Sequence, residues 1–260
     1  MDCPAPSPPI RRRTLLALAG GALLATTPAR GQATATLRGF TENLPPLNYE
    51  EHGRAQGFSV ELLRLMAAEA GQGLEIEVLP WTRAVLAASQ TPQSLLFSLT
   101  RTPERETQYQ WLGPIGPRRI VIYRLDSRAD IRPAAALSQL KGLKLGAVRD
   151  SATARQLLAD GLRPDEDLEW ARDDETNLRK LLARRMDLIV MLDWAAAWHL
   201  RRQRLPYATL TPVLAYDTDK SYWYGLPPDT DPALLQRLRA ALDQLKRDGR
   251  YERLRQRYFA

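Results

Sequence analysis

Apolar positions recur along the chain in short runs and in helical stripes, which predicts strands that alternate with helices. Leu74, Ile76 and Val78 alternate with acidic residues, the period of a half-buried strand. Short, mostly apolar runs predict further strands at 37–40, 95–99, 120–125, 143–148, 188–192 and 222–226. Helical spacing predicts helices at 59–70, 82–89, 152–160, 175–185, from 194, at 232–248 and at 251–259. This alternation indicates an α/β fold with parallel sheets.

Polar residues at the predicted helix ends support these boundaries. Ser59 is expected to cap the first helix, and Gly71 to close it. Asp231 is placed to cap the helix that begins with Pro232.

The buried run 95–99 ends in a polar turn that reaches Arg105. Thr102 stands at an N-cap and Pro103 at the first helical position, so a short helix should follow the strand directly. The turn would bring the hydroxyls of Ser98 and Thr100, backbone N–H groups and the Arg105 guanidinium to the end of the sheet where ligands bind in open α/β folds. Such donors suit a small carboxylate ligand. An Arg105 that merely pairs with Glu104 or Glu106 on a solvated turn explains the same pattern equally well.

Glycines and prolines at 113–117 interrupt the alternation before a second block repeats it. We interpret this segment as a crossing between domains. The C-terminal helices are left over and should return to the first block. This predicts one lobe made of 34–116 and 224–260 and a second made of 117–223, joined by two crossings.

The N-terminus has the order of a secretory signal peptide. Arg11–Arg13 precede an apolar run over 15–25 that is too short and too glycine-rich to span a bilayer, and small residues follow it. We expect cleavage after Ala33 or Ala29, which makes 1–33 the signal peptide. The pair Arg12-Arg13 resembles a twin-arginine export signal, and a general secretory signal is the alternative. Either route predicts export to a bacterial periplasm.

Charge and cysteine content exclude several function classes. The segment 1–33 holds four Arg and one Asp, so the formal charge of +7 falls by 3 to +4 on the mature chain. The charges are interspersed, which disfavours nucleic-acid binding. Cys3 is the single cysteine and would be removed, which excludes a disulfide or thiol nucleophile in the mature chain. His52 and His199 have no matching His or Cys that could complete a metal site, so we expect no metal and no cofactor.

Several collinear motifs carry a family resemblance: Gly57-Phe58-Ser59-Val60-Glu61-Leu62-Leu63, Pro80-Trp81, Thr100-Arg101-Thr102-Pro103-Glu104-Arg105, Gly142 to Val148, Arg185-Met186-Asp187-Leu188-Ile189, and Leu242 to Tyr251. Over 37–259 the chain resembles the amino-acid-type (family 3) extracellular solute-binding proteins of ABC importers. The resemblance implies a two-lobed periplasmic-binding-protein fold of type II, with the ligand cleft between the lobes. It also implies a monomer that carries a small solute to a membrane permease.

The resemblance assigns the ligand-binding residues one position at a time. Arg105 would clamp the ligand carboxylate, Thr100 would contact it, Trp81 would stack on the ligand, and Glu42 is the acid near the first strand end. In the second lobe, the helix N-terminus falls on Ser151, Ala152 and Thr153, and the acid that holds the α-amine falls on Asp193 with a one-residue shift. Ser98, where the family usually has glycine, completes the set.

The departures from the family pattern leave the ligand class open. Ser59 replaces the usual aspartate, and Ser151-Ala152-Thr153 replaces a common Gly-Thr. Carboxylate binding survives these changes better than α-amine recognition, so an amino acid and another organic anion both remain candidates.

Two other functions of this fold, an enzyme and a sensor domain, are less favoured than a binding protein. An enzyme such as a dehydratase of prephenate-like acids would need an acid with a raised pKa in the cleft. Glu42, Glu175 and Asp193 are the candidates, and none carries a catalytic motif. A sensor domain would be expected to carry a fused membrane span. We therefore expect a binding protein rather than an enzyme.

Overall fold

The computed structural model describes residues 1–3 and 36–259. The chain divides into the units Met1–Ala33 and Thr34–Ala260, and the fold below is that of the second unit. The predicted signal peptide, with its arginine pair and cleavage sites, lies outside the described residues apart from its first three positions.

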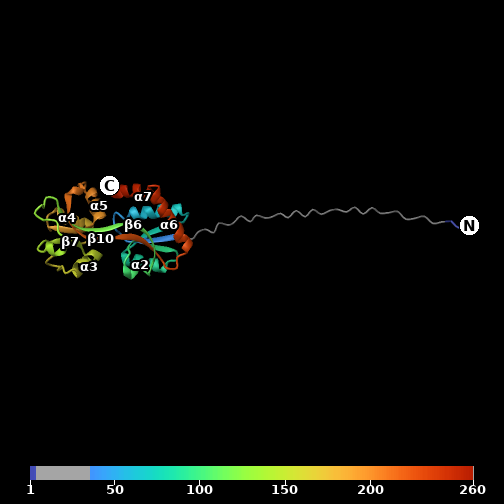
Figure 1. Ribbon diagram of the computed structural model, residues 1–260, viewed down its shortest axis with the longest axis horizontal. Coiled ribbons are helices and arrows are strands. Elements are labelled where there is room, and N and C mark those ends of the chain that lie inside the picture. Colours follow the sequence, from blue (N-terminus) through green and yellow to red (C-terminus); the bar gives the residue numbers. More distant parts are fainter. Residues whose placement is uncertain (4–35, 260) are drawn as a thin grey trace. The chain divides into compact units, whose positions relative to one another are not determined.

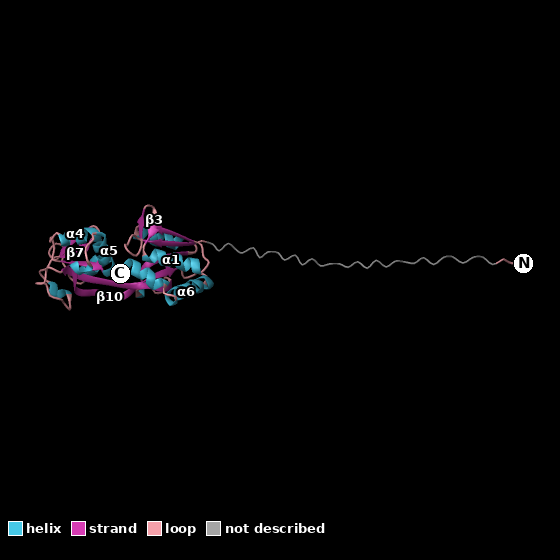
Figure 2. Ribbon diagram, turned by 90° about the horizontal axis from the view of Figure 1, so that it is seen from above, coloured by secondary structure: helices cyan, strands magenta, loops and turns pink. Residues whose placement is uncertain are grey.

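An eight-stranded mixed sheet runs through this unit in the order β4-β1-β5-β10-β6-β9-β7-β8 (Figure 1). Its strands are β1 (Leu37–Thr41), β4 (Leu74–Val78), β5 (Ser94–Thr100), β6 (Gln110–Leu125), β7 (Leu145–Val148), β8 (Leu168–Ala171), β9 (Leu188–Leu192) and β10 (Leu210–Leu226). β1 is parallel to β4 and β5, and β7 is parallel to β8 and β9, which confirms the predicted parallel pairing. A small hairpin of β2 (Tyr49–Glu51) and β3 (Arg54–Gln56) stands apart (Figure 2).

Helices cover both faces of the sheet. With β1, β4 and β5 lie α1 (Phe58–Glu69), α2 (Trp81–Gln90), α6 (Pro232–Arg247) and α7 (Arg250–Phe259). We call this group the first lobe. With β7, β8 and β9 lie α3 (Ala152–Ala159), α4 (Asp174–Leu182) and α5 (Asp193–Arg202), the second lobe. Short 3-10 turns are η1 (Pro103–Arg105), η2 (Leu137–Leu140) and η3 (Tyr207–Thr209). In Figure 1, α2 and α3 lie on one face and α4, α5 and α7 on the other.

The two central strands differ from the sequence prediction. The segment 113–117, predicted to be a crossing before the next strand, is part of β6, which is 16 residues long, and β10 has 17 residues and begins at Leu210 rather than at Tyr222. Their antiparallel ladder shifts register at several points, and such irregularities tolerate the missing donors of Pro114 and Pro117. The crossings between the lobes are therefore continuous strands. Because these strands run through both lobes, the predicted boundaries at 116/117 and 223/224 stay predictions.

One predicted cap is wrong. α1 begins at Phe58 with Gly57 as its N-cap, and Ser59 lies inside the helix. Gly57 has φ 114°, and a Cβ there would lie 2.4 Å from the Leu47 carbonyl oxygen, so glycine is required by both conformation and space. The cap at Asp231 is confirmed, because its carboxylate accepts the Ala233 N–H at 2.9 Å.

An aromatic cluster fills the junction between α5 and the first lobe. The Trp194 ring lies 4.0 Å, centroid to centroid, from Phe259 and 5.8 Å from Phe58. It rests on Gly116 of β6, where a Cβ would approach the indole to 2.3 Å. Gly116, which the sequence analysis placed in the crossing between domains, therefore packs directly against a buried tryptophan.

Candidate functional site

Three predicted ligand-binding residues follow the carboxyl ends of parallel strands in the first lobe. Glu42 follows β1, Trp81 opens α2 after β4, and Arg105 lies in η1 after β5. Because these strands are parallel, their carboxyl ends meet at one edge of the sheet, the usual position of ligands in open α/β sheets. Strand order alone therefore brings the three side chains together.

The Arg105 guanidinium is the charged centre of this edge. Its carbon lies 5.7 Å from the centre of the Trp81 ring, and Nη1 donates to the Thr100 carbonyl oxygen at 3.3 Å. Within residues 36–259, no carboxylate lies within 4 Å of it. Burial raises the pKa of the nearby Glu42, and the positive charge of Arg105 partly offsets this rise.

The acids beside Arg105 in sequence are engaged elsewhere. Glu106 accepts the Arg101 Nε–H at 2.8 Å as part of a two-toothed pair. Glu104 lies beside Thr102, whose hydroxyl lowers the pKa of its carboxyl. Neither acid forms an ion pair with the Arg105 guanidinium.

Arg101, which sequence reasoning missed, closes the turn that carries Arg105. Its guanidinium stacks on Trp223 at 5.0 Å and on Trp111 at 5.6 Å from the ring centres. The Trp111 indole N–H also donates to the Glu106 carbonyl oxygen at 3.2 Å. A bidentate ion pair and two ring contacts hold the turn in one shape.

Ser98 lies behind this edge, inside the first lobe. It is 5% exposed, and its hydroxyl donates to the Asn48 side-chain oxygen and lies 3.0 Å from the Ser59 hydroxyl. The Asn48 amide in turn donates to the Glu42 carbonyl oxygen at 2.6 Å. Ser98 and Asn48 therefore fix the backbone that carries Glu42.

In the second lobe, the predicted anion-binding helix begins where expected. The Ser151 hydroxyl accepts the Ala154 N–H at 3.0 Å, which makes Ser151 the N-cap of α3. Ala152 and Thr153 occupy the first turn, where backbone N–H groups have no helical acceptor and carry the positive end of the helix dipole.

Asp193, predicted to hold an amine, already has several partners. Its Oδ1 accepts the Tyr123 hydroxyl at 2.8 Å and the Tyr207 hydroxyl, and its Oδ2 lies 3.8 Å from Arg119 Nε. These contacts satisfy most of its acceptor capacity within the lobe.

Asp174 is a candidate that the sequence analysis did not single out. It is half-buried in the first turn of α4, shortly after the carboxyl end of β8, and within residues 36–259 its carboxylate forms no hydrogen bond or ion pair. Burial, with the neighbouring Asp173 carboxylate, raises its pKa to about 6. Its sequence position after Asp173, the true N-cap, makes it look like an ordinary first-turn acid.

Tyr222 stands between the two lobes. It is buried on β10, and burial raises its pKa to about 12, with the Glu42 and Asp174 carboxylates adding to the rise and Arg118 opposing it. Acids from both lobes are thus within electrostatic reach of one hydroxyl.

The strand register gives the spacing between the two edges. Thr100 at the end of β5 pairs with Tyr222, which pairs with Gly116, whereas Leu192 at the end of β9 pairs with Ile120. The two edges therefore meet β6 four residues apart, between 116 and 120, or about 13 Å at the rise of an extended strand. The carboxyl ends of β5 and β9 are therefore offset by this distance along β6.

Two surface pockets lie away from these residues, beside α1 and α7. Their volumes are about 660 and 350 Å³, and neither is lined by the predicted ligand-binding residues. In the described part of the chain, no cluster of three or more His, Cys, Asp or Glu could hold a metal ion. No helix among the same residues has the length and apolar character needed to cross a membrane.

Comparison with known families decides the assignment. The model of the bacterial extracellular solute-binding proteins, family 3, matches residues 38–260. The chain belongs to this family. The resemblance drawn from the sequence motifs is confirmed, and the location of the family is extracellular by its description.

Relatives of this solute-binding protein include binding proteins and enzymes. The chain is 23% identical to the probable amino-acid-binding protein YxeM of Bacillus subtilis, with 96% of each chain covered. It is 26% identical over 95% of its length to the membrane-bound lytic murein transglycosylase F of Ectopseudomonas mendocina, but spans only about half (51%) of that enzyme.

Solved structures confirm the fold. The ancestral cationic amino acid solute-binding protein AncCDT-1 superposes with a TM-score of 0.71 at 21% identity, covering 86% of this chain and 96% of that one. A histidine kinase sensor domain with similarity to periplasmic binding proteins gives 0.69 at 24% identity, covering 88% and 97%. The predicted two-lobed α/β fold of periplasmic binding proteins is therefore correct.

Proposed function

We propose that this protein captures a small carboxylate-bearing solute, an amino acid or related organic anion, and delivers it to the membrane permease of an ABC importer. The observation that carries the proposal is the half-buried Arg105 guanidinium, which has no carboxylate partner among the described residues and lies at the edge where ligands bind. A guanidinium binds a carboxylate through two parallel hydrogen bonds, which gives both strength and orientation.

The remaining residues have distinct roles in this proposal. Trp81 offers a flat apolar surface to the ligand, and Thr100 adds a hydroxyl beside Arg105. Across the gap, Ala152 and Thr153 at the start of α3 donate backbone N–H groups to the same carboxylate when the lobes close. Closure moves 117–223 against 34–116 with 224–260, and β6 and β10 bend at the crossing.

Two acids favour a ligand that also carries a positive group. Glu42 in the first lobe and Asp174 in the second both have raised pKa values, because burial disfavours their charged forms. A ligand ammonium or guanidinium between them would restore both charges. Names of two neighbours, an ancestral arginine-binding protein and the cationic amino acid protein AncCDT-1, support the amino-acid assignment.

Export completes the proposal. Residues 1–33 would direct a monomeric mature chain to the periplasm, where it meets both the solute and its permease. N-terminal sequencing of the periplasmic protein tests this, and a mature chain that begins at Met1 would contradict it.

A second candidate is a dehydratase that acts on prephenate-like acids. Asp174 has a pKa of about 6, within the range of a general acid at neutral pH. A solved neighbour is described as a precursor of cyclohexadienyl dehydratase. Incubation with prephenate and detection of phenylpyruvate by absorbance tests it. Turnover that survives in Asp174→Asn would remove this residue from the reaction.

A thermal-shift screen of purified mature protein against amino acids, polyamines and organic acids tests the binding function. A ligand at a hundredfold excess over its dissociation constant stabilises the protein by about 2.7 kcal/mol. Each molecule that stabilises the protein in the screen is then titrated calorimetrically into the wild-type protein and into Arg83→Gln. This variant is the control, because it removes an exposed arginine on α2. A screen in which neutral and cationic molecules without a carboxylate bind best would contradict the proposal.

A further inference from the structure

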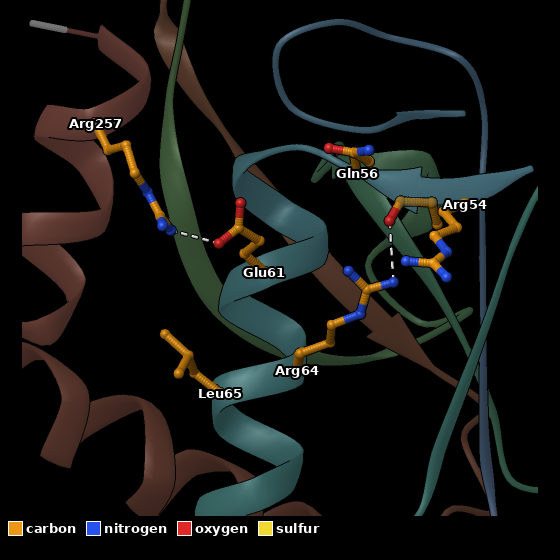
Figure 3. A pocket seen from close by; sticks show the side chains of 7 residues that line it. Arg54, Gln56, Glu61, Arg64, Leu65 and Arg257 are labelled. Atoms are coloured by element: carbon orange, nitrogen blue, oxygen red, sulfur yellow. Dashed lines mark hydrogen bonds and ion pairs between the residues drawn. The ribbon is translucent and has the colours of Figure 1, made fainter. Parts of the chain in front are cut away.

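The larger surface pocket, of about 660 Å³, is bordered by arginines from three elements (Figure 3). Arg54 extends from β3, Arg64 from α1 and Arg257 from α7, with Gln56, Leu65 and Ala55 completing the lining. This volume lies within the range of small-molecule sites and exceeds what a single inorganic ion fills.

The positive charge of this pocket is poorly compensated. Glu61 is its single carboxylate, and it already accepts the Arg257 guanidinium and the Tyr258 hydroxyl. Within residues 36–259, the single hydrogen bond of the Arg64 guanidinium goes to the Ala55 carbonyl oxygen at 2.9 Å. Among residues 36–259, the Arg54 side chain forms no hydrogen bond or ion pair. At least two guanidiniums therefore face the hollow without an acid.

The second pocket, of about 350 Å³, continues the same basic surface. It shares Glu61 and Arg257 with the first pocket and adds Arg201 and Arg202 from α5. Within residues 36–259, the single hydrogen bond of the Arg201 guanidinium goes to the Arg257 carbonyl oxygen at 3.5 Å. Arg202 lies 3.9 Å from Glu51 and over the Trp198 ring. Five arginines against one lining glutamate thus form a continuous concave surface over α1, α5 and α7.

We propose that this surface is a second binding site, specific for an oligoanion that carries two or more phosphate or carboxylate groups. Guanidiniums match the planar, two-oxygen geometry of these groups, and a concave wall of one charge concentrates the opposite charge. A ligand with several anionic groups engages arginines on different elements at once, which a single ion does not. The site is separate from the strand-end residues and does not depend on their function.

Titration calorimetry with pyrophosphate and citrate at low ionic strength tests this proposal on the mature protein, with phosphate and acetate as single-group controls. We expect the oligoanions to bind at least about tenfold more tightly than the single-group ions, and the affinity to fall steeply as salt shortens the Debye length from about 30 to about 8 Å. Arg54→Gln/Arg64→Gln should weaken oligoanion binding at least tenfold. Glu61→Gln should strengthen it, because Arg257 is released.

The matched control is Arg132→Gln/Arg237→Gln, which removes the same charge from two exposed arginines outside the pockets. Equal losses in the two double variants would overturn the site, as would wild-type protein that binds neither pyrophosphate nor citrate. Vesicles of phosphatidylglycerol and of phosphatidylcholine identify the source of the anion. If the protein sediments with phosphatidylglycerol vesicles and Arg54→Gln/Arg64→Gln does not, the site binds lipid headgroups. If the protein binds the soluble probes but not the vesicles, the site binds a dissolved solute.

Discussion

Replacing Arg105 by alanine removes the guanidinium that lies over Trp81 and leaves the rest of the turn in place. The wild-type side chain makes one hydrogen bond of 3.3 Å within the protein, to the Thr100 carbonyl oxygen. Arg101 and Glu106 hold the turn without it. The variant should therefore keep its fold and its melting temperature, so any loss of affinity reports on the ligand contact.

The magnitude follows from the surroundings of the guanidinium. Truncation of one partner of a buried charge pair costs about 2–5 kcal/mol, whereas an exposed pair contributes about 0–1 kcal/mol. Arg105 is half-buried, so we expect a loss of about 2–4 kcal/mol, or roughly thirty- to several-hundred-fold in affinity at 1.4 kcal/mol per decade. Lysine should restore only part of it, because an ammonium lacks the two-toothed fork.

Calorimetric titration of wild type, Arg105→Ala and Arg105→Lys with one ligand from the screen measures this loss. Arg83→Ala, on the exposed face of α2, is the matched control and should bind normally. A folded Arg105→Ala protein that binds within threefold of wild type would refute the carboxylate clamp and leave the proposed ligand class without its main support.

Three further changes probe the support of this site. Arg101→Ala should lower affinity about tenfold without touching ligand, because the turn loses its pair with Glu106; an Arg101→Lys variant that binds like wild type would show that charge alone suffices. Gly116→Ala should destabilise the protein by about 1–3 kcal/mol in urea, since a Cβ would lie 2.3 Å from the Trp194 ring; unchanged stability would show that the ring moves freely. Asp174 has a raised folded-state pKa of about 6 against 3.8, so its contribution to stability is complete below pH 4 and is lost as the pH rises to about 6, by about 1–3 kcal/mol. Asp174→Asn should flatten the urea-unfolding profile over that range, and parallel profiles would contradict the assignment.

Patterns that depend on local sequence were predictable in this chain. The run at 95–99 is apolar except for Ser98 and lies within β5, and the cap at Asp231 follows from its own side chain. Ser59 failed as a cap because the close approach of the Leu47 backbone, a tertiary contact, imposes glycine at the helix start. The part of β6 before Ile120 was not predicted because prolines disfavour a strand locally, whereas its irregular ladder with β10 accepts them.

The candidate site shows the same limit. Arg105 could be proposed from the sequence because a strand, a cap and a proline identify the turn that carries it. Asn48 was missed because its partners, Ser98 and the Glu42 carbonyl, are brought to it by the fold rather than by spacing. Asp174 differs from other first-turn acids only in its burial, which no local pattern encodes.

The continuous strands β6 and β10 also determine how the protein unfolds. Each contributes hydrogen bonds to both lobes, β10 to β5 and β6 to β9, and the two pair with each other along most of their length. Neither lobe has a complete sheet once the other has melted, so partial unfolding would expose both central strands at once. Cooperativity therefore extends across the crossings, and we expect the two lobes to melt in a single transition, even though the proposed function has them move against each other on ligand binding.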